Sequence, residues 1–179
     1  MNIKPNMIHG CYEIHPRVVT DERGAFVKIF HKEIFEGNGL AVNYSEQYYS
    51  RSKKGVLRGL HFQTPPHDHA KLVYCTEGEV LDVVVDLREK SPTYGKHLKF
   101  LLSAEKSNAV YIPSGLAHGF YVLSDYATMV YNVTSLYAPE SDMGVHWSSA
   151  GIDWPDKHPI VSSRDEGFIS LAEFKSEFN

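Results

Sequence analysis

Short apolar runs separated by turn signals follow one another along most of this chain. The runs are rich in Val, Ile, Tyr, Phe and Leu, and turn residues mark the segments 21–24, 53–55, 76–78, 91–95 and 113–115. Short strands with turns at such intervals are typical of an antiparallel sandwich or barrel. We therefore predict an all-β fold.

The segment 80–86 indicates how one of these strands faces its surroundings. Asp82 and Asp86 share one parity, and three apolar residues share the other. Because successive side chains of a strand point to opposite faces, we expect one face in the core and the other to carry polar groups. A carboxylate among apolar neighbours needs a partner when buried, so we expect Asp82 to orient a histidine or a hydroxyl.

Helical signals are few and short. One helix is expected near residues 31–36 and another over 170–178, where Ser170 and Glu173 form a possible capping box with Ile169 and Phe174 as its hydrophobic staple. The segment 150–159 is predicted to be a long connection, and no linker or repeat divides the chain. We expect one domain over residues 1–179.

Composition limits the possible functions. The chain has 179 residues with 42% hydrophobic and 22% charged content, which is ordinary for a globular domain. No apolar run approaches the roughly 20 residues that span a bilayer, and the N-terminus does not resemble a signal peptide, so we predict a cytoplasmic protein. A formal net charge of -4 argues against general nucleic-acid binding.

Two strings carry the clearest chemistry. Segment 57–63 contains Arg58, Gly59 and His61, and segment 113–120 contains His118. Strict alternation would put Arg58 and His61 on opposite faces, so a shared pocket requires a bulge, which glycine permits. A guanidinium in an apolar strand usually binds an anion. We therefore predict a pocket for acid/base chemistry on an anionic small molecule.

A metal site is the alternative use of the histidines. His67, His69 and His118 could hold a divalent transition ion. Metal-dependent cupins usually place a glutamate four or five residues after an HxH pair, but those positions are Val73 and Tyr74. We therefore predict no metal.

Several strings together resemble the dTDP-4-dehydrorhamnose 3,5-epimerase family, a branch of the cupins. They occur in order from Asp21 to Asp165: LRGLHFQ, KLVYCTEGEVLDVVVDLR, SPTYGK, IPSGLAHGF, VLSD, YAPESDMG and GIDWP. The resemblance implies a cupin jelly roll (double-stranded β-helix), a homodimer and no cofactor. It also implies a nucleotide-diphosphate sugar as substrate, with inversion of C3, C5 or both beside the C4 ketone of a 4-keto-6-deoxyhexose, in deoxysugar biosynthesis.

The resemblance also implies roles for particular residues. His61 matches the general base, Asp165 its paired carboxylate, Tyr131 the acid on the opposite face of the sugar, and Lys71 a lysine near the ketone oxygen. Arg23 and Arg58 match residues that hold the diphosphate. The complete substrate-binding set that it implies is Arg23, Phe26, Gln47, Arg58, Gln63, Asp82 and His118.

The chain departs from the family strings at a few positions. Glu46-Gln47-Tyr48 replaces a QDN-like string, His69-Ala70 replaces a glutamine-glycine pair, and Met143 replaces an arginine. A carboxylate would repel a phosphate, so Glu46 is expected to point elsewhere or to contact a different group. The nucleotide, the hexose and the inverted carbon stay open. A metal-dependent cupin oxygenase or isomerase and a non-catalytic sugar-binding cupin remain alternatives.

Overall fold

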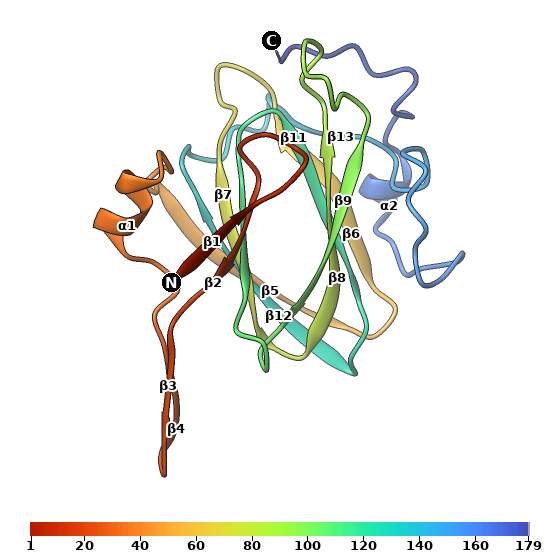
Figure 1. The fold of residues 1–179 in the computed structure, drawn as a ribbon. Coiled ribbons are helices and arrows are strands. Elements are labelled where there is room, and N and C mark those ends of the chain that lie inside the picture. The colour runs from red at the N-terminus through yellow and green to blue at the C-terminus, as the bar shows by residue number, and fades with distance from the viewer. Residues whose placement is uncertain (179) are drawn as a thin grey trace.

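Two antiparallel sheets face each other in the computed structural model, which describes residues 1–178 (Figure 1). The six-stranded sheet has the order β1 (Asn2–Pro5), β2 (Tyr12–His15), β10 (Ala109–Ile112), β7 (Lys71–Glu77), β12 (Tyr126–Val133) and β5 (Glu46–Lys53). The five-stranded sheet has the order β13 (Asp142–Gly144), β6 (Leu57–Gln63), β11 (Leu116–Val122), β8 (Glu79–Asp86) and β9 (His97–Ser103). The predicted all-β jelly roll is confirmed.

Apolar side chains fill the space between the sheets and also cover their outer faces. Val84 and Phe120 belong to the cluster between the sheets, whereas Val83 packs outside with Trp154 from the C-terminal segment. The prediction that only one face of β8 lies in the core is therefore wrong. Residues 145–178 cover the second face, and a pattern within β8 cannot reveal that.

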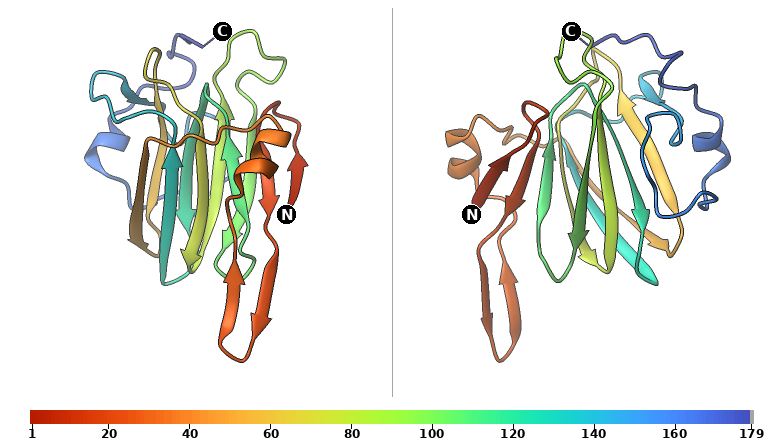
Figure 2. Two further views of the ribbon diagram at one scale, coloured as in Figure 1. Left: turned by 90° about the vertical axis from the view of Figure 1, so that its left-hand side faces the viewer. Right: turned by 45° about the vertical axis from the view of Figure 1, so that its right-hand side comes forward.

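A hairpin of β3 (Val18–Asp21) and β4 (Gly24–Val27) extends away from the two sheets as an arm (Figures 1 and 2). Val19 and Phe26 are exposed on this arm, with relative accessibilities of 49% and 64%. Two strands alone bury little apolar surface. The arm thus presents apolar side chains that its own chain leaves uncovered.

The first predicted helix is confirmed as α1 (Lys32–Gly37), and the segment 150–159 is an irregular connection as expected. The other helix is α2 (Ser163–Glu166), and none of the helices among residues 1–178 could cross a membrane.

The prediction of a helix over 170–178 is wrong, although one half of its capping box forms. The Glu173 carboxylate accepts the N–H of Ser170 at 3.1 Å and its hydroxyl at 2.6 Å, but a single turn follows. Further along, the N–H of Glu89 donates to the carbonyl of Phe178 at 3.0 Å, and Phe174 packs on Phe62. Contacts with the rest of the chain thus replace the helical ladder.

The predicted bulge at Gly59 is confirmed. Arg58 pairs with Phe120 and His61 with His118, so β6 has one more residue than β11 over this stretch. Gly59 has a φ of 138°, and a Cβ there would lie 2.6 Å from the Cα of Gly119. The extra residue brings Arg58 and His61 to the same side of the strand.

Candidate active site

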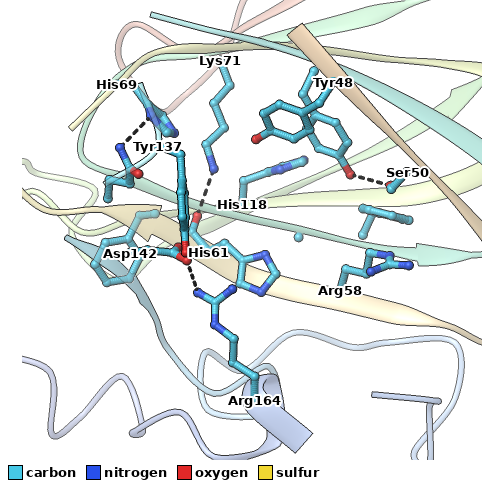
Figure 3. A pocket seen from close by; sticks show the side chains of 15 residues that line it. Tyr48, Ser50, Arg58, His61, His69, Lys71, His118, Tyr137, Asp142 and Arg164 are labelled. Atoms are coloured by element: carbon cyan, nitrogen blue, oxygen red, sulfur yellow. Dashed lines mark hydrogen bonds and ion pairs between the residues drawn. The ribbon is translucent and has the colours of Figure 1, made fainter. Parts of the chain in front are cut away.

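A cavity of about 300 Å³ opens between the two sheets (Figure 3). Its lining residues include His61 and His118 from the five-stranded sheet and Lys71 and Tyr131 from the six-stranded sheet. We call this cavity the catalytic pocket. It brings together most of the residues that the sequence analysis singled out.

His61 is bonded to a carboxylate that lies far away in the sequence. Its Nε2 lies 2.9 Å from Oδ1 of Asp165, and Oδ2 of Asp165 accepts the N–H of Gly59 at 3.0 Å. Burial alone would raise the pKa of Asp165, but the bonds from His61 and Gly59 hold it below the ordinary value. An ionised carboxylate at Nε2 favours the tautomer with hydrogen on Nε2, which leaves Nδ1 free to accept a proton.

Asp165 occupies its position because α2 begins beside it. The hydroxyl of Ser162 accepts the N–H of Asp165 at 3.1 Å and caps the helix. The carboxylate is then 4% exposed, in contrast to the ordinary turn residue that the local sequence alone would indicate.

Tyr131 lies on the opposite wall of the pocket from His61. Its hydroxyl lies 3.2 Å from Oγ of Ser50, and its ring stacks on Tyr48 with a centroid distance of 4.9 Å. Burial raises the pKa of Tyr131 well above the usual range of a phenol. The side chain therefore stays protonated at neutral pH and can donate a proton.

Lys71 provides a cation between the two walls. Its Nζ donates to the carbonyl of His61 at 3.3 Å, and the residue is 6% exposed. Burial lowers the pKa of Lys71 to about 8, although Asp142 and Asp82 oppose the shift. The side chain is thus mainly cationic at pH 7 and close to losing its proton.

Asp82 lies behind the pocket and orients His118. Its Oδ2 lies 2.7 Å from Nε2 of His118, as predicted, and Asp82 is fully buried. Burial raises the pKa of Asp82, and His118 offsets part of the shift. His118 lines the catalytic pocket but Asp82 does not, so Asp82 acts there through the imidazole that it orients and through its charge near Lys71.

Arg58 and Gln63 also line the pocket. The guanidinium of Arg58 donates to Oγ of Ser52 at 2.9 Å. The amide of Gln63 holds the surrounding loops, because its Nε2 donates to the carbonyl of His67 at 2.7 Å and its Oε1 accepts the N–H of Ala138 at 2.8 Å. The guanidinium of Arg58 therefore keeps more unused hydrogen-bond donors for a ligand than the amide of Gln63 does.

Besides Asp82, three predicted binding residues lie outside the pocket of their own chain. Arg23 and Phe26 belong to the arm, where the guanidinium pairs with Asp21. Gln47 points to the outer face of its sheet and donates to Oδ1 of Asn132 at 2.7 Å. Its neighbours in β5 face inward instead, because alternate residues of a strand point to opposite sides.

The histidines proposed as metal ligands are not arranged as a metal site. His69 Nδ1 lies 3.0 Å from Oγ of Ser135, and His67 Nε2 lies 3.5 Å from Oε1 of Glu140. His118 is directed at Asp82. Among residues 1–178, no group of three or more His, Cys, Asp or Glu side chains could hold an ion.

An ion pair that was not predicted from the sequence lies at the rim of the pocket. Arg164 Nη2 lies 2.8 Å from Oδ2 of Asp142, and both residues line the pocket (Figure 3). Tyr137 lines the same pocket and is 61% exposed. Asp142 and Tyr137 lie in the YAPESDMG string and Arg164 directly precedes Asp165, so these neighbouring strings were the available signal.

Comparison with known proteins gives the chain a context. A sequence model of the dTDP-4-dehydrorhamnose 3,5-epimerase family matches residues 5–173. A dTDP-4-dehydrorhamnose 3,5-epimerase of Shigella flexneri is 44% identical over 92% of this chain and 93% of its own length. A dTDP-4-dehydrorhamnose 3-epimerase of Streptomyces niveus is 40% identical over 97% and 85%.

A solved structure has the same fold. The epimerase of Legionella pneumophila in complex with dTDP-4-keto-L-rhamnose superposes with a TM-score of 0.92 at 39% identity, covering 97% of this chain and 94% of that one.

Proposed function

Because the chain belongs to the dTDP-4-dehydrorhamnose 3,5-epimerase family, we propose that its pocket inverts a nucleotide-linked 4-keto-6-deoxyhexose with His61 as base and Tyr131 as acid. The observation that carries the proposal is their position on opposite walls of one pocket. A proton removed on one face of a flat intermediate can then be returned on the other. That sequence inverts the carbon.

The first step removes a proton beside the ketone. Nδ1 of His61 takes the proton from C3 or C5, and the C–H electron pair moves toward the ketone oxygen to form an enolate. Asp165 stabilises the imidazolium that results. General base catalysis of this kind contributes about 10²- to 10⁴-fold in rate.

The enolate needs positive charge close to its oxygen. Lys71 is the cation that we assign to this oxygen, because it lies in the pocket between the two walls, and His118, oriented by Asp82, lines the same pocket. Both act in a site between two packed sheets, where an electrostatic interaction is stronger than in water.

The second step returns a proton to the other face. The hydroxyl of Tyr131 donates to the carbon, and the electron pair of the enolate forms the new C–H bond. The phenolate then regains a proton from solvent, and the imidazolium of His61 releases its proton to solvent. All groups in this scheme are side chains, and the reaction requires no redox change, so we propose that no cofactor takes part.

The proposed assembly is a homodimer. It is supported by the arm, which carries exposed Val19 and Phe26 together with Arg23 and lies apart from the pocket of its own chain. In such a dimer the arm of each protomer would reach the pocket of its partner and add Arg23 near the diphosphate. For location we propose the cytoplasm, in keeping with two free cysteines.

Exchange of solvent hydrogen tests the proposed function. The protein is incubated in D₂O with 4-keto-6-deoxyhexoses linked to dTDP, CDP, GDP and UDP, and deuterium at C3 and C5 is followed by NMR. We expect exchange at C3, C5 or both with at least one of these sugars. A folded protein that exchanges none of them would overturn the proposal.

A further inference from the structure

A second cavity adjoins the catalytic pocket. It is lined by Glu46, Tyr48, Gln63, His69, Val133 and Tyr137, and we call it the Glu46 cavity. Tyr48, Gln63, His69 and Tyr137 line both cavities. A substrate held between His61 and Tyr131 can therefore extend into the Glu46 cavity.

Departures from the family strings meet in this cavity. Glu46 and Tyr48 lie on β5, whereas His69 lies just before β7, so the fold brings together changes that are separate in the sequence. The family strings have amide side chains here, and an amide both donates and accepts. A carboxylate only accepts hydrogen bonds. The change therefore alters which hydrogen-bonding groups the cavity can bind.

Glu46 has an unused acceptor. Its Oε1 accepts the N–H of Tyr137 at 3.1 Å, and no hydrogen bond to Oε2 is formed by the described residues. No Lys, Arg or His of residues 1–178 forms an ion pair with this carboxylate. Glu46 is only partly exposed. It is therefore suited to accept a hydrogen bond from a ligand.

His69 is neutral beside Glu46. Burial, together with the nearby charge of Lys71, lowers the pKa of His69 to about 3. Its Nδ1 lies 3.0 Å from Oγ of Ser135, whereas its Nε2 is buried with no hydrogen-bond partner in the described chain. The Glu46 cavity thus has polar groups but no cation.

The parts of a nucleotide sugar can be assigned by elimination. The diphosphate needs cations, and Arg58 and Arg164 line the catalytic pocket while the Glu46 cavity has none. A substituent of the hexose would stay close to the ketone. Lys71, Val133 and Glu46 are register partners on three adjacent strands, which places Glu46 two strand spacings, about 10 Å, from Lys71. The nucleobase is the one part of the substrate that remains to be placed.

The walls of the cavity also suit a base. Tyr48 and Tyr137 are 44% and 61% exposed, and an aromatic side chain offers a surface on which a planar ring can stack. On the basis of the proposed function, we propose that the Glu46 cavity holds the nucleobase and that Glu46 selects a base with an exocyclic amine over thymine.

The selection follows from hydrogen-bond chemistry. Cytosine presents an amine at C4, from which a carboxylate accepts, whereas thymine and uracil present a carbonyl oxygen at the same place. A carboxylate and a carbonyl oxygen repel each other. A good polar pair of this kind discriminates between bases by about tenfold or more.

The test compares CDP and UDP, which differ along one edge of the base: cytosine has an amine at C4 and an unprotonated N3, whereas uracil has a carbonyl oxygen at C4 and an N–H at N3. Their dissociation constants for the full chain are measured by calorimetry. We expect CDP to bind at least about tenfold more tightly than UDP. In Glu46→Gln the amide oxygen still accepts the N–H of Tyr137 and its NH₂ can donate to a carbonyl, so the preference should disappear or reverse.

Glu105→Gln is the matched control, because Glu105 is exposed and lines neither cavity. It should keep the preference for CDP. Equal binding of CDP and UDP to the wild-type chain, or an unchanged ratio in Glu46→Gln, would overturn the inference. Such results would leave the proposed function intact if a 4-keto sugar still exchanges at C3 or C5. Loss of all exchange would instead contradict the proposed function.

Discussion

His61 Nε2 lies 2.9 Å from Asp165 Oδ1, although the two residues are 104 positions apart in the sequence. The same carboxylate accepts the N–H of Gly59, two residues before His61. Asp165 therefore connects the short helix α2 to the bulge in β6. One side chain orients the imidazole and satisfies a backbone group of the bulge.

Substituting His61 should remove the first chemical step. We expect His61→Asn to lower kcat by about 10³-fold or more and to abolish deuterium exchange, because it removes the group that we assign as the base. Asp165→Asn should lower kcat by about 10²- to 10⁴-fold, because an amide no longer favours the same tautomer. NMR of samples quenched at timed intervals measures both effects. His158→Asn is the control, because His158 is exposed. Exchange at the wild-type rate in His61→Asn would contradict the assignment.

Substituting Tyr131 should separate the two steps. Tyr131→Phe keeps the ring that stacks on Tyr48 but lacks the proton donor, so we expect exchange to continue while inverted product falls by about 10²-fold or more. The measurement follows deuterium uptake and product stereochemistry in the same sample. Tyr126→Phe, on the same strand but outside the pocket, is the control. Full inversion by Tyr131→Phe would show that another group donates the proton.

Lys71 should produce a descending limb in the pH profile. With a pKa of about 8, the ammonium is lost as the pH rises through 8, so kcat/KM should fall there. Lys71→Met should remove this limb along with most of the activity. A pH profile of kcat/KM for wild type and variant measures this. A wild-type rate that stays constant up to pH 9.5 would count against Lys71 as the essential cation.

The same lysine should reduce stability. Burial lowers its pKa from 10.5 to about 8, so the unfolded chain binds more protons between these values. The resulting loss in the free energy of unfolding is complete below about pH 8 and disappears as the pH rises toward 10.5. Urea unfolding at pH 7 should show Lys71→Met more stable, on the order of 2 kcal/mol, with exposed Lys99→Met within about 0.5 kcal/mol of wild type. Destabilisation of Lys71→Met would contradict this account.

Gly59→Ala should destabilise the fold and the site together. A Cβ there would meet the backbone of Gly119 at 2.6 Å, at a φ of 138°. We expect a loss of about 2 to 5 kcal/mol in the free energy of unfolding. Gly95→Ala separates backbone strain from close approach, because its φ is 73° but the space around it is open. A loss at Gly59 no larger than at Gly95 would mean that the two strands can move apart.

A mixed dimer should test the arm. Arg23→Ala leaves the pocket intact and His61→Asn leaves the arm intact, so a heterodimer of the two should recover one working pocket. We expect activity in co-purified heterodimers above that of either variant alone, measured by deuterium exchange. A heterodimer with no more activity than the average of the two variants measured separately would place Arg23 outside the partner's pocket.

Much of the site could be predicted because its signals are local. The Arg58-Gly59-Leu60-His61 string required a bulge, and the structure has it at Gly59. Asp82 needed a partner and has His118. Gln47, which the resemblance implies to be a substrate-binding residue, lies outside the pocket, because the register of β5 with β12 turns it outward. The helix expected over 170–178 was lost to contacts with residues 87–89.

By itself the sequence determined the strands, the bulge and the residue types available for proton transfer, because strand periodicity and glycine conformation depend on near neighbours. Only the tertiary structure decided that Asp165 reaches His61, that Glu46 and His69 line one cavity, and that Arg23 lies apart from the pocket of its own chain. These relations depend on which distant segments pack together, and packing is set by the whole chain.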